Sequence, residues 1–185
     1  MSILISSLVG KKVFSVHDGA CVAVASSWLI NKDNLKIEII IVKLVGNNSE
    51  RYILTSDILM GLPGHITIRS QDDIMETEDL IRQRELIKSK YTLLGAKVMT
   101  RSGVKVGTVK DFAYDLSNWH LTKMHIRAGF PQRILQASLI IDRSAVIEVK
   151  GSTVIVKDSC VRAKVKAKTR TKLNTKRTAV KVLPA

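Results

Sequence analysis

The chain has few aromatic residues and only two cysteines, and these shortages exclude several classes of protein. Phe, Trp and Tyr together make up 4% of the 185 residues. A surface that stacks nucleic-acid bases needs several aromatic rings, so sequence-specific recognition of a single strand by a folded part of the chain is disfavoured. Cys21 and Cys160 have neither the spacing of metal ligands nor the density of a disulfide scaffold, so we expect two free thiols.

Long hydrophobic runs and catalytic patterns are also missing. The longest strongly apolar window, residues 37–45, contains two charges and is far shorter than the ~20 residues that cross a membrane. Residues 1–10 lack the basic start of a secretory signal, so we expect a cytoplasmic protein with no membrane span. The four histidines show no ligand spacing, and His120 and His125 would face opposite sides of a strand. We therefore expect no metal, no cofactor and no catalytic residue.

The residues that are abundant predict an all-β fold. Hydrophobic residues make up 45% of the chain, and Val, Ile and Leu supply about two thirds of them. Short β-branched segments alternate with Gly, Asn and Asp turns, which is typical of small β-rich cores. We expect two small β-barrels in tandem, a short helical connector and a disordered basic tail. The corresponding ranges are 1–74, 75–92, 93–160 and 161–185.

Individual strands follow from β-branched content and alternation. The block Ile39–Val42 predicts a strand buried on both faces, either under the other unit or inside a closed barrel. Residues 57–62 fit a helical turn or a loop, because Gly-Leu-Pro-Gly ends them. Lys150-Gly151-Ser152 predicts a compact hairpin. Predicted strands cover 11–16, 21–30, 35–45, 51–54 and 65–69 in the first unit, then 119–126, 134–141, 146–149 and 153–156 after two strands joined at Gly103.

The connector has the charge pattern of a helix. Acidic residues crowd its start and basic residues its end, an arrangement that complements a helix dipole. This predicts a helix around residues 76–88. Its apolar stripe is expected to pack on a barrel rather than stay exposed for a partner, and consists of Leu80, Ile81, Leu86 and Ile87.

The sequence also contains an internal repeat. Leu8-Val9-Gly10-Lys11-Lys12-Val13 aligns with Leu93-Leu94-Gly95-Ala96-Lys97-Val98, and the match continues to Trp28 against Phe112. We infer an internal duplication of units of roughly 70 residues, each near the lower limit for independent stability. The two units are therefore expected to pack on one another.

The repeated pattern, V-G-x-x-V, a turn glycine, V-G-x-V-x-D and a later Asp, resembles the PRC-barrel family. The resemblance covers roughly residues 8–159 in two copies, and the second copy is closer to the pattern because the first has Ala23 and Ser27 where the second has Gly107 and Asp111. The family implies small, non-enzymatic β-barrels, known from a photosynthetic reaction-centre subunit and from a ribosome-maturation factor that docks on a ribosomal protein. The structural motif residues that it implies are Gly10, Gly19, Gly95, Gly103, Gly107, Asp111 and Asp115.

Two features of the second unit leave alternatives open. Asp111 and Asp115 could share acid and base duties, but a position beside a strand and a turn favours structural hydrogen bonds. Trp119 follows a turn and could anchor a protein partner, although burial preferences favour a place in the core.

The tail concentrates positive charge. Residues 161–185 hold nine basic residues and no acidic one, which leaves +5 of the net +14 to the rest of the chain. Basic residues occupy every even position from 162 to 172, so an extended tail would place six cations on one side, ~6.6 Å apart. Two interpretations stand, a solubilising extension and a polyanion-binding segment. The candidate polyanion contacts are Arg162, Lys164, Lys166, Lys168, Arg170, Lys172, Lys176, Arg177 and Lys181.

These observations lead to one leading hypothesis and two alternatives. The leading hypothesis is a non-enzymatic intracellular adaptor whose barrels dock on a protein or ribonucleoprotein partner while the tail contacts RNA or another polyanion. The first alternative is a small-ligand-binding or electron-transfer-associated regulatory module. The second is an enzyme.

Overall fold

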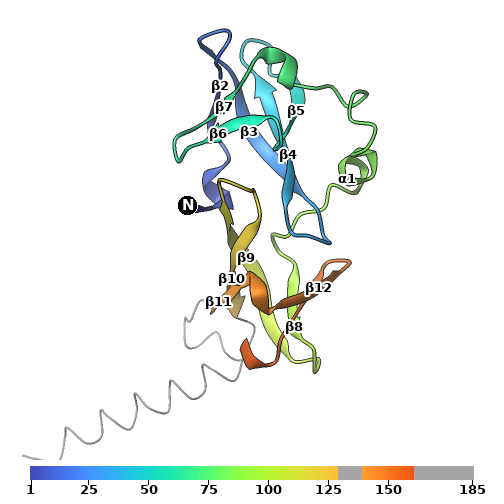
Figure 1. Ribbon diagram of the computed structural model, residues 1–185. Coiled ribbons are helices and arrows are strands. Elements are labelled where there is room, and N and C mark those ends of the chain that lie inside the picture. Colours follow the sequence, from blue (N-terminus) through green and yellow to red (C-terminus); the bar gives the residue numbers. More distant parts are fainter. Residues whose placement is uncertain (129–138, 161–185) are drawn as a thin grey trace, which may run out of the picture.

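The computed structural model describes residues 1–128 and 139–160. Their strands form two sheets, which follow one another along the chain and lie end to end (Figure 1). The predicted all-β class is confirmed at this level. Closed barrels in tandem stay a prediction, because each sheet keeps two separate edge strands within the described residues.

The first sheet has six strands in the order β5-β4-β3-β2-β7-β6. Neighbouring strands are antiparallel except for β2 and β7, which run parallel. The turns between them contain the Gly, Asn and Asp residues expected from the sequence. The strands are β2 (Lys12–Ser15), β3 (Ala20–Ile30), β4 (Ile37–Leu44), β5 (Glu50–Leu54), β6 (Ile58–Gly61) and β7 (His65–Ile68).

The second sheet repeats this order as β11-β10-β9-β8-β13-β12, again with one parallel pair, β8 and β13. A seventh strand, β1 (Ser2–Leu4), pairs with β9. The other strands are β8 (Lys97–Thr100), β9 (Lys105–Asp115), β10 (Leu121–Ala128), β11 (Leu139–Asp142), β12 (Val146–Lys150) and β13 (Thr153–Val156).

The two sheets share their register as well as their order. Trp28 pairs with Ile40 in the first sheet, and Phe112 pairs with Met124 in the second. The long strands β3 and β9 also carry a bulge at the same place, between Ala25 and Ser27 in one and opposite His125 and Ile126 in the other. This agreement, strand by strand, is what the inferred duplication requires.

The sequence located most strands but missed β6. Residues 57–62 were expected to form a helical turn or a loop, whereas Ile58–Gly61 pairs with β7 and forms the edge of the first sheet. The 146–156 hairpin is confirmed as β12 and β13. The part of the predicted strand 134–141 before Leu139 lies outside the described residues.

The connector contains less helix than predicted. It has one α-helix of six residues, α1 (Arg84–Ser89), after a 3-10 turn at Gln71–Asp73. Within the described residues, two further 3-10 turns lie at Ile5–Ser7 and Arg143–Ala145. Thr77, Glu78 and Asp79 form turns, so the charge pattern was a poor guide to the start of the helix. No helix within residues 1–128 and 139–160 combines the length and the hydropathy needed to cross a membrane.

The connector nevertheless covers a sheet, and three of the four residues of its apolar stripe pack there as predicted. The fourth, Ile81, was expected to pack as well but is 69% exposed. Leu80 and Ile87 are buried against Leu29, Ile39 and Tyr52, on the outer face of the first sheet. Ile40, the next residue of β4, belongs to the main core on the other face. The expected burial of β4 on both faces is therefore confirmed, and the connector rather than the second unit covers its outer face.

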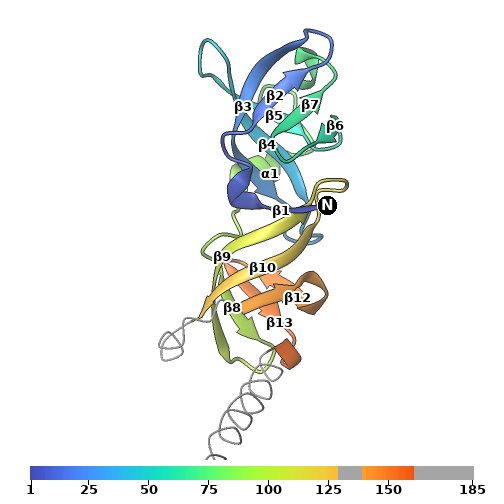
Figure 2. The same ribbon diagram turned by 90° about the vertical axis from the view of Figure 1, so that its left-hand side faces the viewer.

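One main hydrophobic core extends through both sheets. It joins residues of β3 and β4 to residues of β9 and β10 without a break. The N-terminal segment crosses between them, because β1 pairs Ile3 with Tyr114 of β9 although residues 1–74 were assigned to the first unit (Figure 2). The two units are thus packed on one another, as expected from their small size.

Candidate interaction surface

Two equivalent turns form the junction between the sheets. In the turn after β3, the N–H of Leu35 donates to the carbonyl of Asn31, at 2.9 Å. In the turn after β9, the N–H of Trp119 donates to the carbonyl of Asp115, at 2.8 Å. Leu35 and Trp119 both adopt a left-handed backbone, with φ of 57° and 63°. Non-glycine residues rarely do so, and here each places a large apolar side chain in the junction.

The two turns then bond to each other reciprocally. The N–H of Ile37 donates to the carbonyl of Trp119, and the N–H of Leu121 donates to the carbonyl of Leu35, both at 2.9 Å. Lys36 and His120 form an antiparallel bridge between these bonds. Each sheet gives the other the same contact that it receives, which is the arrangement of a symmetric dimer interface within one chain.

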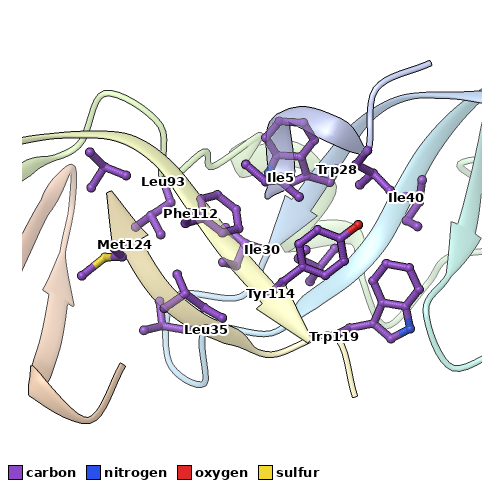
Figure 3. Packing of buried hydrophobic residues seen from close by; sticks show 14 of the residues in the cluster. Ile5, Trp28, Ile30, Leu35, Ile40, Leu93, Phe112, Tyr114, Trp119 and Met124 are labelled. Atoms are coloured by element: carbon purple, nitrogen blue, oxygen red, sulfur yellow. The ribbon is translucent and has the colours of Figure 1, made fainter. Parts of the chain in front are cut away.

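Aromatic side chains fill the space behind these turns (Figure 3). Trp28 and Phe112, which are equivalent residues, meet edge to face with ring centroids 6.3 Å apart. Trp119 stacks on Tyr114 at 5.4 Å and is only 4% exposed. The proposed role of Trp119 as a surface anchor for a partner is therefore wrong, because its ring is buried between the two sheets of its own chain.

Asp111 fixes the N-terminal segment on the second sheet. Its carboxylate accepts hydrogen bonds from the Ser6 hydroxyl at 2.6 Å and from the Phe112 N–H at 2.8 Å. Ser27, the equivalent residue in β3, is too short to make such a contact. The geometry thus gives Asp111 a role in positioning the segment that leads into the first sheet.

Asp115 closes the turn before Trp119. Its carboxylate accepts from the N–H of Ser117 at 2.8 Å and lies 3.2 Å from the terminal amine of Met1. The Ser117 hydroxyl and N–H, followed by the amine, lower the pKa of Asp115 to about 2. Asn31 occupies the equivalent position and likewise accepts from the Asp33 N–H, at 2.9 Å. The two residues are turn caps in both copies.

The motif glycines lie where the chain turns or strands approach closely. Gly10 and Gly95 are equivalent and have φ of 85° and 78°, a region that glycine adopts at no steric cost. Gly19 and Gly103 lie in the turns that lead into β3 and β9. Gly107 has a different constraint, because a Cβ atom there would lie 2.0 Å from the carbonyl oxygen of Arg127. The first copy has Ala23 at this position.

An exposed apolar edge stands next to the junction. Leu59 and Met60 of β6 are 52% and 54% exposed, and Leu62 follows them at the surface. No other strand within the described residues pairs with the free edge of β6. Gly61 joins this edge to the junction, since a Cβ atom on Gly61 would lie 3.0 Å from the Leu116 side chain and 3.3 Å from Trp119.

A buried lysine supports the end of this edge. The ammonium of Lys11 donates to the carbonyl of Leu62 at 3.1 Å, and the residue is 5% exposed. Burial lowers the pKa of Lys11. Ala96 occupies the equivalent position of the second copy and cannot donate such a bond. The contact between the residue before β2 and the loop after the edge strand is therefore specific to the first sheet.

The equivalent edge of the second sheet is charged. β12 follows the same path as β6 and has the same bulge, so Met60 corresponds to Glu148 and Leu62 to Lys150. Glu148 and Lys150 form an ion pair at 3.0 Å. Charged side chains on an edge strand discourage pairing with another chain, whereas an apolar edge invites it. The candidate interaction surface is therefore the β6 edge, defined as Leu59, Met60 and Leu62.

Sequence reasoning missed the β6 edge for an identifiable reason. The Gly-Leu-Pro-Gly run directly after it suggested a loop, and four residues are too few for periodicity to decide. The internal duplication could have located β6. Aligning the predicted 146–156 hairpin with residues 58–68 would have predicted an equivalent hairpin there. The nine cations proposed for polyanion binding, Arg162 to Lys181, lie outside the described residues.

Residues 1–128 and 139–160 contain no group of three or more His, Cys, Asp or Glu side chains able to hold a metal ion. Cys21 and Cys160 are free thiols and half-buried. A comparison of the chain with protein-family models gives no match, and neither does a comparison with curated proteins.

Proposed function

We propose that the chain is a non-enzymatic adaptor that docks on a protein or ribonucleoprotein partner through two PRC-barrel-like units, while the tail contacts RNA or another polyanion. The duplicated strand order supports the two-unit part of this proposal. One observation carries the docking part, namely the unpaired apolar edge of β6 beside a charged counterpart in the second sheet.

The partner offers an extended segment that adds a strand to β6. An exposed edge supplies backbone donors and acceptors in a row, and alternate side chains supply specificity. Leu59, Met60 and Leu62 call for apolar side chains on that segment, because an unpaired charge placed against them would lose hydration without compensation.

The duplication provides the variants that test docking. Met60→Glu combined with Leu62→Lys gives the first edge the charges of the second, on the same backbone path. Ile147→Glu is the matched control, because Ile147 of β12 is 43% exposed and corresponds to Leu59. All three changes are at the surface and should leave the thermal midpoint close to that of the wild type.

The measurement is affinity capture with full-length chain, followed by direct binding of the purified partner. A partner retained after nuclease treatment, lost with the Met60→Glu/Leu62→Lys variant and kept by Ile147→Glu supports the proposal. Equal retention by both variants refutes docking through β6. Loss of every partner after nuclease shows that the contact runs through nucleic acid instead.

The tail is tested separately. Removing residues 161–185 should leave the thermal midpoint nearly unchanged, because the segment lacks the apolar content to join a core. If about six of its cations meet phosphates of a single strand, the log–log salt dependence of the full chain should have a slope near −4, and a shallow slope without the tail. Equal slopes would move polyanion binding away from the tail.

A further inference from the structure

Positive charge is divided unequally between the two halves of the chain. Residues 1–92 hold eleven basic and eleven acidic side chains, whereas residues 93–185 hold nineteen basic and five acidic ones. The second half therefore carries the whole net charge of +14. Ten of its basic residues precede the tail, so the second sheet has an excess of its own.

The carboxylates of the second sheet do not compensate this charge at the surface, because each one already has a partner within the chain. Four of them accept hydrogen bonds from serine hydroxyls, and Glu148 pairs with Lys150. The hydroxyl donors are Ser6 to Asp111, Ser117 to Asp115, Ser144 to Asp142 and Ser102 to Asp158.

Two cations and two hydroxyls form one row across the outer face of this sheet. Thr153 of β13 pairs with Lys97 of β8, Lys97 pairs with Thr108 of β9, and Thr108 pairs with Arg127 of β10. Residues paired across strands project from the same face, so the four side chains lie side by side. Lys97 and Arg127 are two strands apart, which places their backbones about 10 Å from each other. Figure 2 shows β8, β9 and β10 adjacent in the lower sheet.

The cations of this row are unengaged. Lys97, Thr108 and Arg127 are exposed, and within the described residues neither Lys97 nor Arg127 has an ion pair or a side-chain hydrogen bond. Lys110, at the bulge of β9, is a third exposed cation of this kind. Lys123 lies further along β10 on the same face, opposite Asp142 of β11.

The first sheet has the same row with different chemistry. His65, Lys12, Val24 and Lys43 occupy the four equivalent positions. The two cations are kept, but Val24 replaces the central hydroxyl. Ser26 and Ile39 stand where the second sheet has Lys110 and Lys123. A matched surface of lower charge density is therefore present in the same molecule.

We propose that the outer face of the second sheet, defined as Lys97, Thr108, Lys110 and Arg127, binds the phosphodiester backbone of single-stranded nucleic acid. The inference rests on the polyanion-binding part of the proposed function and adds a second contact outside the tail. Lysine and arginine neutralise phosphates, and threonine hydroxyls donate to phosphate oxygens. The face holds no aromatic ring among these four residues, so binding depends on charge rather than on base identity.

The test uses the full chain and a single-stranded RNA of about 20 nucleotides. Lys97→Gln combined with Arg127→Gln removes two cations from the second sheet, and Lys12→Gln combined with Lys43→Gln removes the equivalent two from the first. Both variants change the net charge equally. Thermal midpoints are measured first, to show that each variant is folded.

The second-sheet variant should bind RNA about tenfold more weakly at low salt, with a log–log salt slope shallower by about 1.4, as expected for two lost contacts on a single strand. The first-sheet variant should lose less than about twofold. Equal losses in both variants would show that net charge alone is responsible and would overturn the inference, as would no loss in either while the wild type binds. No binding of RNA by the wild type would refute the polyanion part of the proposed function together with this inference. Binding to anionic vesicles without binding to RNA would also refute it.

Discussion

The two sheets have the same strand order, register and bulges, yet equivalent positions on their outer faces differ in character. On the first sheet, Leu29 and Ile39 are covered by the connector. On the second, the equivalent residues are Ala113 and Lys123, and Lys123 is exposed. At these positions the first face is thus part of a core and the second carries an exposed charge, although the first face also keeps the exposed cations Lys12 and Lys43 further along. Side chains on one face of a sheet can change completely while the pairing that fixes the backbone stays the same.

The edge strands β6 and β12 also differ, but here the first sheet is the more apolar at an exposed position. β6 has an apolar free edge, and β12 has an ion pair at the same place. The first unit therefore offers an edge suited to a protein strand and the second a face suited to phosphate. Under the two proposals above, the two copies of one architecture would bind different partners while sharing one junction.

The largest effect is expected at the junction, which the two sheets share. Trp119→Ala should lower the free energy of unfolding by about 4 kcal/mol, and Leu35→Ala, at the equivalent position, by about 3 kcal/mol, because both open cavities in a buried cluster. Since the cluster extends through both sheets, each variant should still unfold in one transition. Denaturant titrations followed by circular dichroism measure both quantities. Two separate transitions would show that the sheets are independent.

An effect smaller than that of Trp119→Ala is expected from exchanging equivalent residues on the outer faces. Ile39→Lys should cost about 3 kcal/mol, because it places an ammonium among Leu80, Ile87 and Tyr52. Lys123→Ile makes the opposite exchange at an exposed position and should change stability by less than about 0.5 kcal/mol. Thermal and denaturant unfolding of the two variants give the comparison. Similar losses in both would mean that the second face is covered too.

The carboxylates of the second copy should contribute less still. Asp111→Asn and Asp115→Asn should each cost about 1 to 2 kcal/mol, since an amide accepts fewer of the hydrogen bonds from Ser6 and Ser117. Ser27→Ala, the control at the position equivalent to Asp111, should stay within about 0.5 kcal/mol. Denaturant unfolding decides the matter. Unchanged stability in both Asn variants would remove the structural role assigned to these residues.

The contribution of Asp115 to stability should also depend on pH. Its folded pKa of about 2 lies below the value near 3.9 of an unfolded chain. The contribution of ionised Asp115 to the free energy of unfolding is therefore fully present above about pH 5 and is lost as the pH falls through 4 towards 2. The stability difference between wild type and Asp115→Asn should shrink over that range, measured by unfolding at pH 2 to 7. A constant difference would contradict the assignment.

The sequence predicted the elements whose signals are local. Turn glycines, β-branched strands and the 146–156 hairpin all depend on neighbouring residues, and the structure has them. The repeat also anticipated that the two units pack together. Asp111 and Asp115 have the structural hydrogen bonds that their positions beside a strand and a turn suggested.

The features that were missed depend on distant parts of the chain. β6 is a strand because β7 pairs with it, and nothing in Ile58–Gly61 alone distinguishes it from a loop. The core position favoured for Trp119 is confirmed, but the second turn, at Leu35, that completes its burial could not be identified from the residues around Trp119. In the connector, the acidic start satisfied the expected helix dipole, but Asp79 caps a turn by accepting from the Glu76 N–H, at 3.0 Å. Local hydrogen bonds of this kind compete with a helix.

The pairing of β1 with β9 affects how the chain can fold while it is being synthesised. Ser2 is opposite Asp115, so the strand emerges roughly 110 residues before its partner. At about 5 to 20 residues per second, the delay amounts to roughly 5 to 20 s. During that time Ile5 and Leu8, which are fully buried in the finished protein, have no second sheet to cover them. The nascent first unit thus presents an unfinished apolar surface to nearby chaperones until β9 has been synthesised.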